Sequence, residues 1–309
     1  MNKGKALRAG DTIGLVATSS PATEELLVKS IAALESFGFK VKVSGTCRER
    51  YGGYLAGTPQ QRAFELNAMF ADDEVDGIMC MRGGYGSPQI LPLLDYDCIA
   101  QNPKLFVGYS DITALHASFG QEASLATLHG PMATSDIAQG QNDWTIQYLL
   151  RAMTCPEPLG AIINPPGEEI VCLVEGEASG PIVGGNLTLI AALMGTPYQL
   201  DARGKLLFLE DIDEEPYRID RMLTQLALGG VFDECAGIVI GTWTDCEPKK
   251  REGFTVWDVF QNIVVPYQKP TLWNVQSGHG TTNMALPLGV QAGLDAASCQ
   301  LTIEESVTL

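Results

Sequence analysis

The chain has 309 residues, of which 45% are hydrophobic and 18% charged, and its formal net charge at pH 7 is -17. This length is enough for two domains whose cores need no disulfide staples. The acidic balance argues against nucleic acid and anionic membrane as partners, because both would require a basic face. No apolar run reaches the length of a membrane span, and no apolar signal segment follows the basic residues near the N-terminus.

The eight cysteines are scattered along the chain, and no two of them form a C-x-x-C pair. Several of them, such as Cys80 and Cys172, lie in apolar runs typical of strands. We therefore expect buried free thiols in a reducing cytoplasm, and neither disulfides nor a zinc site.

The N-terminal part alternates strand-like and helix-like segments. Residues 12–17 form a continuous apolar run, which is typical of a strand covered on both faces. The segments expected next are a helix at about 23–37, a strand at 40–43, a helix at about 59–70 and a strand at 77–80. This β-α-β order predicts a parallel, doubly wound sheet, which binds ligands at the carboxyl ends of its strands.

A glycine-rich loop, Arg82-Gly83-Gly84-Tyr85-Gly86, follows the strand at 77–80. Such a loop can cradle phosphate, although it matches neither the Walker A motif nor the dinucleotide fingerprint. Its glycines can also bring backbone N–H groups close to a reacting carbonyl. A tight turn at the edge of the sheet is the third interpretation.

Ser110 lies at a predicted turn from strand to helix. Residues 105–107 are apolar, Gly108 interrupts the run, and residues 111–118 have apolar side chains at helical spacing. Such an elbow exposes the hydroxyl and directs the free N–H groups of a helix N-terminus toward the group that the serine attacks. The alternative is a plain helix N-cap with Asp111 in the first turn.

The N-terminal half contains two histidines, His116 and His129. His116 lies six residues beyond Ser110 on the expected helix, and we interpret it as a packing residue. His129 ends a strand-like run at 125–128, so it lies either near the site or in a structural hydrogen bond.

A proline-rich stretch at 154–169 lacks periodicity and is predicted to link an N-terminal domain at 1–153 to a C-terminal domain at 170–309. Strands are expected beyond it at 171–174, 178–183, 206–209, 235–241 and 270–275, with helices ending near 195, at 216–228 and at about 254–264. We therefore predict an α/β protein. Its N-terminal sheet is doubly wound and mostly parallel, and its second α/β domain has mixed, partly barrel-like strands.

Three residue types of a nucleophilic hydrolase stand at strand ends in this pattern. Ser110 occupies the elbow, Glu210 is expected at the end of an apolar strand, and His279 lies between two glycines after another strand. A serine nucleophile needs a base, and the base needs a carboxylate that orients it. The order Ser, Glu, His also occurs in α/β-hydrolases, but their G-x-S-x-G motif is absent because position 112 is Ile.

Several short motifs, taken in order, resemble the LD-carboxypeptidase family of serine peptidases over residues 12–295. The segments that carry this resemblance are Arg82–Gly86, Gly108–Asp111, His129–Met132, Gly184–Leu187, Leu209–Asp211 with Tyr217–Arg221, and Gly278–Gly280. Each motif is weak alone, and the ordered set is specific.

The resemblance implies a triad of Ser110, Glu210 and His279, with an oxyanion hole formed by the backbone N–H groups of Asp111 and Gly84. It also implies a cytoplasmic enzyme that needs no metal or other cofactor and forms a homodimer. Family members cleave the bond between an L-centre and the terminal D-alanine of murein tetrapeptides during cell-wall recycling.

The sequence is also compatible with two other functions. The microcin-immunity branch resembles the same family and cleaves peptidyl or aminoacyl nucleotides with the same triad. The compact segment after Glu210 favours the murein enzyme, whereas Trp243 and Trp273 are candidates for an aromatic side chain that stacks on a base. The third possibility is a non-catalytic protein that binds a phosphorylated ligand at the glycine-rich loop.

Overall fold

The computed structural model describes residues 1–249 and 253–309, which form two compact units. The first unit contains Met1–Pro158, Met284–Gly289 and Ser306–Leu309, and the second contains Leu159–Asn283 and Val290–Glu305. Both units are α/β, as predicted. The linker at 154–169 stays a prediction.

In the described residues of the first unit, the central sheet has six strands in the order β12-β5-β4-β3-β1-β2. Strands β1 to β5 run parallel to one another, and β12 pairs antiparallel to β5 at the edge. Their bounds are β1 Thr12–Val16, β2 Lys40–Val43, β3 Gly77–Cys80, β4 Leu105–Gly108, β5 Thr127–His129 and β12 Leu286–Leu288. The predicted mostly parallel, doubly wound sheet is therefore confirmed.

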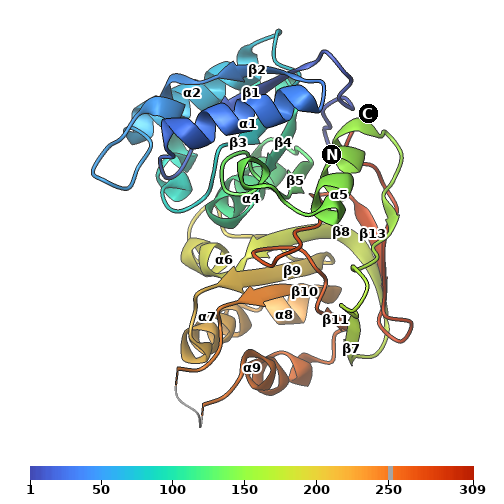
Figure 1. The fold of residues 1–309 in the computed structure, drawn as a ribbon. Coiled ribbons are helices and arrows are strands. Elements are labelled where there is room, and N and C mark those ends of the chain that lie inside the picture. The colour runs from blue at the N-terminus through green and yellow to red at the C-terminus, as the bar shows by residue number, and fades with distance from the viewer. Residues whose placement is uncertain (250–252) are drawn as a thin grey trace. The chain divides into compact units, whose positions relative to one another are not determined.

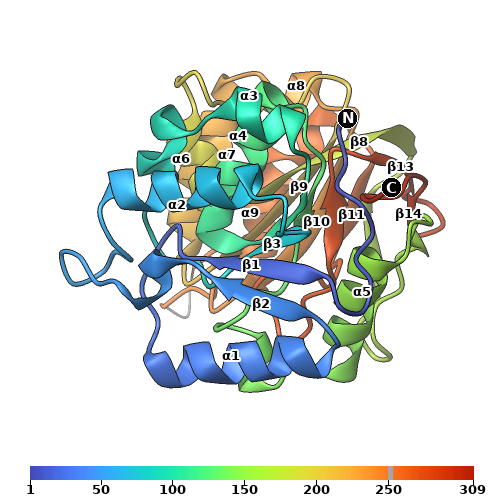
Figure 2. The same ribbon diagram turned by 90° about the horizontal axis from the view of Figure 1, so that it is seen from above.

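Helices cover both faces of this sheet, with α1 on one face and α2, α3 and α4 on the other (Figure 2). The helices of the unit are α1 Glu24–Ser36, α2 Pro59–Ala71, α3 Tyr96–Gln101, α4 Thr113–Glu122 and α5 Asp143–Thr154. Local sequence explains where α2 begins. Thr58 accepts a hydrogen bond from the N–H of Gln61, the Gln61 side chain accepts one from the N–H of Thr58, and Pro59 takes the first helical position.

The described part of the second unit contains an eight-stranded sheet in the order β6-β14-β13-β8-β9-β10-β11-β7. Strands β8 to β11 are parallel, and the outer strands pair antiparallel, so that the sheet is mixed and curled (Figure 1). The bounds are β6 Gly160–Ala161, β7 Val171–Val174, β8 Glu177–Asn186, β9 Leu206–Ile212, β10 Gly237–Thr244, β11 Thr271–Trp273, β13 Gln291–Asp295 and β14 Gln300–Ile303.

The helices of the second unit pack as a series, with α6 against α7 and α7 against both α8 and α9. They are α6 Leu187–Leu193, α7 Pro216–Leu228, α8 Val231–Glu234 and α9 Val256–Ile263. The apolar side chains of β9 that the sequence marks as a strand, Leu206 to Leu209, are fully buried and form the centre of this core. Within the described ranges, no helix is both long and apolar enough to cross a membrane.

Strands β8 and β9 extend beyond the ends that the sequence predicts. Strand β8 continues through Gly184 and Gly185, because at Gly184 a side chain would meet the Phe208 carbonyl oxygen at 2.0 Å and only glycine allows the two backbones to approach. Strand β9 continues to Ile212, since its residues pair with β8 up to Asn186 and with β10 up to Thr244. The expected position of Glu210 at a strand end is therefore wrong, because Glu210 lies inside β9.

Candidate active site

Ser110 occupies a strained turn between β4 and the helices that follow it. Strand β4 ends at Gly108, a 3-10 turn spans Ser110–Ile112, and α4 begins at Thr113. The φ of Ser110 is 64°, in the left-handed region that residues other than glycine seldom adopt. Backbone strain of this kind clusters at functional sites, which makes Ser110 a candidate nucleophile.

The carboxylate of Asp111 fastens this turn to its neighbours. Asp111 is buried, and its Oδ2 accepts hydrogen bonds from Ser19 Oγ at 2.6 Å and from the backbone N–H of Ser87 at 2.7 Å. Ser19 follows β1, and Ser87 follows the glycine-rich loop. One carboxylate therefore joins three loops at the carboxyl edge of the first sheet.

The glycine-rich loop passes close to Ser110. A Cβ on Gly83 would lie 2.8 Å from Cβ of Ser110, so any larger residue would displace the serine. Gly84 has φ 112°, and a Cβ there would lie 2.3 Å from Ser20 Oγ. Gly83 is thus the glycine packed against the serine, and Gly84 packs against Ser20. The oxyanion role of Gly84 stays a prediction.

A buried arginine supports the same loops, and sequence reasoning missed it. Arg62 of α2 is 1% exposed and donates to the carbonyl oxygens of Thr18, Gly57 and Gly86 and to Oε1 of Gln89. Burial lowers the pKa of its guanidinium, and the charge of Asp111 acts in the opposite direction. The sequence signal was faint, namely one basic residue on the apolar face of a helix.

His116 does more than pack. Its ring contacts Phe106, with 5.7 Å between ring centroids, and its Nε2 donates to the carbonyl oxygen of Gly108 at 2.8 Å. Burial lowers the pKa of His116 to about 4, so the ring is neutral at pH 7. His116 therefore supports the strand end that precedes Ser110.

His129 ends β5, is buried, and packs edge-on against the ring of Tyr109.

Glu210 and His279 form a close pair in the second unit. His279 Nδ1 lies 2.6 Å from Glu210 Oε2, and Glu210 is completely buried. Because the carboxylate oxygen can only accept, Nδ1 carries the proton and Nε2 keeps its lone pair in the neutral ring. Glu210 Oε1 is buried with no hydrogen-bond partner in the described part of the chain, so the carboxylate is held chiefly by the imidazole.

A second carboxylate lies beside Glu210 on β9. Asp211 accepts hydrogen bonds from Asn186 Nδ2 at 2.8 Å and from the N–H and the hydroxyl of Thr188, both at 2.9 Å. Burial, followed by the charge of Glu210, raises the pKa of Asp211 to about 6. Asp211 thereby fixes the end of β8 and the start of α6 to β9.

The structure thus brings the predicted site residues into two groups. Ser110, Asp111 and Gly84 lie together in the first unit, and Glu210 and His279 lie together in the second. In the described residues, no group of three or more His, Cys, Asp or Glu side chains could hold a metal ion.

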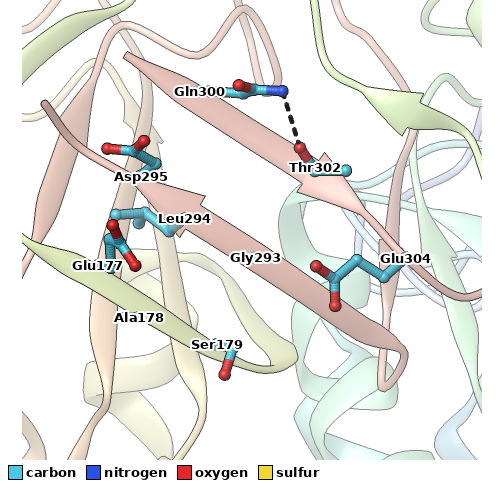
Figure 3. A pocket seen from close by; sticks show the side chains of 9 residues that line it. All are labelled: Glu177, Ala178, Ser179, Gly293, Leu294, Asp295, Gln300, Thr302 and Glu304. Carbon is cyan, nitrogen blue, oxygen red and sulfur yellow. Dashed lines mark hydrogen bonds between the residues drawn. The ribbon is translucent and has the colours of Figure 1, made fainter. Parts of the chain in front are cut away.

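A groove elsewhere in the second unit contains none of these residues. It has a volume of about 600 Å³ and is lined by β8, β13 and β14 (Figure 3). Glu177 and Asp295 stand opposite each other there, and Glu304 lies further along the groove. Because it offers neither a nucleophile paired with a base nor an oxyanion donor, this groove is not a candidate for the chemistry of the Glu210–His279 pair.

Comparison with known proteins gives matches over most of the chain. Residues 13–130 match the LD-carboxypeptidase N-terminal domain, and residues 179–294 match the LD-carboxypeptidase C-terminal domain. The probable murein peptide carboxypeptidase of Bacillus subtilis (strain 168) is 39% identical, with 99% of this chain and 95% of that protein covered.

Two solved structures have the same fold. The structure of MccF in complex with glutamyl sulfamoyl guanosine superposes with a TM-score of 0.92 at 25% identity and covers 99% of both chains. The muramoyltetrapeptide carboxypeptidase from Oxalobacter formigenes gives a TM-score of 0.83 at 26% identity, covering 94% of this chain and 97% of that one.

Proposed function

The chain belongs to the LD-carboxypeptidase family, and from that premise we propose that it is a serine carboxypeptidase acting on murein tetrapeptides. The bond cleaved is the one between an L-centre and the terminal D-alanine, as in cell-wall recycling. The names of the Bacillus subtilis and Oxalobacter formigenes proteins support the substrate class. We further propose that the enzyme is cytoplasmic and homodimeric.

In the proposed mechanism, Ser110 Oγ attacks the scissile carbonyl while His279 Nε2 takes its proton. The N–H groups of Asp111 and Gly84 stabilise the oxyanion of the tetrahedral intermediate. His279 then returns the proton to the nitrogen of D-alanine, which leaves, and an acyl ester remains on Ser110. A water molecule, deprotonated by His279, then attacks that ester, and His279 passes the proton to Ser110 Oγ as the acyl–oxygen bond breaks. Glu210 keeps the proton on Nδ1 and stabilises the imidazolium.

One observation carries the proposal, namely the 2.6 Å hydrogen bond between Glu210 and His279. A fully buried carboxylate is costly unless it is paired, and here its partner is one of only three histidines in the chain. This arrangement is what a general base needs, because the ring is oriented and its developing charge is balanced. The positive φ of Ser110 supports the nucleophile independently.

The test is the release of D-alanine from murein tetrapeptide, measured for the wild type, Ser110→Ala and His279→Ala. We expect release by the wild type and a loss of at least about 10⁴-fold in kcat for each variant, because triad members act as a unit. A double variant should be no worse than either single one. If the wild type neither releases D-alanine nor reacts with a fluorophosphonate at Ser110, the serine mechanism is wrong, and ligand binding without catalysis is the remaining function.

The second candidate is hydrolysis of peptidyl or aminoacyl nucleotides, which the TM-score of 0.92 to MccF in complex with glutamyl sulfamoyl guanosine favours. It is separated from the first by offering the wild type both substrate classes under the same conditions. A kcat/KM higher for the nucleotide conjugate would replace the murein assignment and leave the triad in place.

A further inference from the structure

His279 lies on a short turn, Ser277–Gly280, that leaves little space around it. Gly278 has φ 121°, and a Cβ there would lie 2.6 Å from Glu210 Oε2. The N–H of Gly278 donates to Oδ1 of Asn283 at 3.0 Å. The position of the imidazole therefore depends on where the backbone of this turn is held.

The hydroxyl of Thr242, on β10, bridges the two ends of the turn. Thr242 Oγ1 accepts a hydrogen bond from the N–H of Gly280 at 3.1 Å and donates one to the carbonyl oxygen of Ser277 at 3.3 Å. The N–H of Thr242 donates to the same Ser277 oxygen at 3.1 Å. Thr242 is buried at 7% exposure, so water does not readily replace these bonds.

An irregularity in β10 explains how the hydroxyl reaches this place. Ile240 pairs with Leu209 and Trp243 pairs with Asp211, so two residues of β10, Gly241 and Thr242, stand opposite the single residue Glu210 of β9. A bulge of this kind redirects a side chain out of the regular alternation. At Gly241, a Cβ would lie 2.5 Å from the Ser277 carbonyl oxygen, so glycine is needed for the close approach.

We infer that Thr242 is a positioning residue, which holds the Ser277–Gly280 turn so that the His279 ring keeps its hydrogen bond to Glu210. This inference rests on the proposed function of His279 as the general base. The bulge places Thr242 opposite Glu210. The pair β9 and β10 therefore carries both the carboxylate that orients the His279 ring and the hydroxyl that holds the backbone on either side of His279. Without the hydroxyl, the Gly280 N–H loses its acceptor and the turn can shift away from β10.

The experiment compares Thr242→Val, which replaces the hydroxyl by a methyl group, with Thr242→Ser, which keeps it. We expect Thr242→Val to lower kcat for D-alanine release by about 10- to 100-fold, with KM changed less than about twofold, because a small displacement of a base affects the chemical step. Thr242→Ser should stay within about threefold of the wild type. Thr244→Val, the same change two residues along β10, is the matched control and should behave as the wild type.

A second readout does not depend on the substrate. The proton on Nδ1 of His279 should give a downfield NMR resonance, identified by its loss in His279→Gln. This resonance should be weakened or lost in Thr242→Val and kept in Thr242→Ser.

A kcat equal to that of the wild type and an unchanged resonance in Thr242→Val would overturn the inference while leaving the triad intact. If Thr242→Val does not fold, Thr242→Ala removes the hydroxyl without adding a methyl group and takes its place. If the wild type releases no D-alanine, the proposed function fails, and the resonance alone decides the role of Thr242.

Discussion

Ser110 keeps a backbone conformation that costs about 1–3 kcal/mol for a residue other than glycine. Such strain persists only where the surroundings determine the conformation from several sides. Here Asp111, the residue after Ser110, is held by two hydrogen bonds to its carboxylate, and Gly83 packs directly against the serine. Neighbours on separate loops therefore keep Ser110 in this conformation, and replacing Asp111 should alter the backbone conformation of Ser110.

The buried ring of His116 predicts a pH dependence of stability. Its pKa in the folded state, about 4, lies below the ordinary value of 6.5, so its contribution to stability is complete above pH 6.5 and is lost as the pH falls toward 4. In urea unfolding at pH 6.5 and 4.5, the wild type should lose about 2 kcal/mol more than His116→Gln, whose amide can still donate to Gly108. Parallel losses in the two proteins would show that His116 is not responsible.

At the level of single residues, sequence reasoning found the groups with distinctive chemistry. Ser110 follows an apolar run that Gly108 interrupts, His279 lies between two glycines, and Glu210 is a carboxylate directly after four apolar residues. Thr242 and Arg62 were missed for a physical reason. Their importance depends on which carbonyl and N–H groups of distant loops they meet, and no local pattern encodes that.

At the level of elements, periodicity located most helices and strands, because apolar alternation and caps are local signals. Helix α7, Pro216–Leu228, has the bounds that its proline start and its double glycine end predict. Strand β9 was predicted too short, since the pairing that carries it past Glu210 to Ile212 comes from β8 and β10. The bulge in β10 was likewise invisible, because a bulge is a relation between two strands.

Helix α2 offers a test of how a buried cation holds loops together. Replacing Arg62 by Met leaves the carbonyl oxygens of Thr18, Gly57 and Gly86 without this donor, and we expect a loss of about 2–4 kcal/mol in the free energy of unfolding. Arg62→Lys should be intermediate, since an ammonium cannot reproduce the planar fork.

Urea denaturation measures these losses, and Arg48→Met is the control. Arg48 is half exposed and pairs with Glu24 at the surface, so its replacement should change stability by less than about 0.5 kcal/mol. A wild-type stability in Arg62→Met would mean that the loops satisfy their carbonyl groups in another way.

For the whole molecule, the net charge of -17 predicts a response to salt. Like charges repel more strongly in the compact state than in the unfolded chain, and added salt screens this repulsion. Raising NaCl from 10 to 200 mM should therefore increase Tm by about 2–5 °C. Choline chloride should act equally, and a Tm independent of both salts would contradict the prediction.

The edge strand β12 has a consequence for how the protein is made. Residues 284–289 complete the first sheet, and Leu309 pairs with Gly4, yet all of Leu159–Asn283 is synthesised between the first five strands and these segments. A nascent chain that has emerged only to Pro158 therefore carries a sheet whose β5 edge is still open, and open edges invite pairing with other chains. The first unit, although it begins at the N-terminus, must wait for translation of the second before it can close.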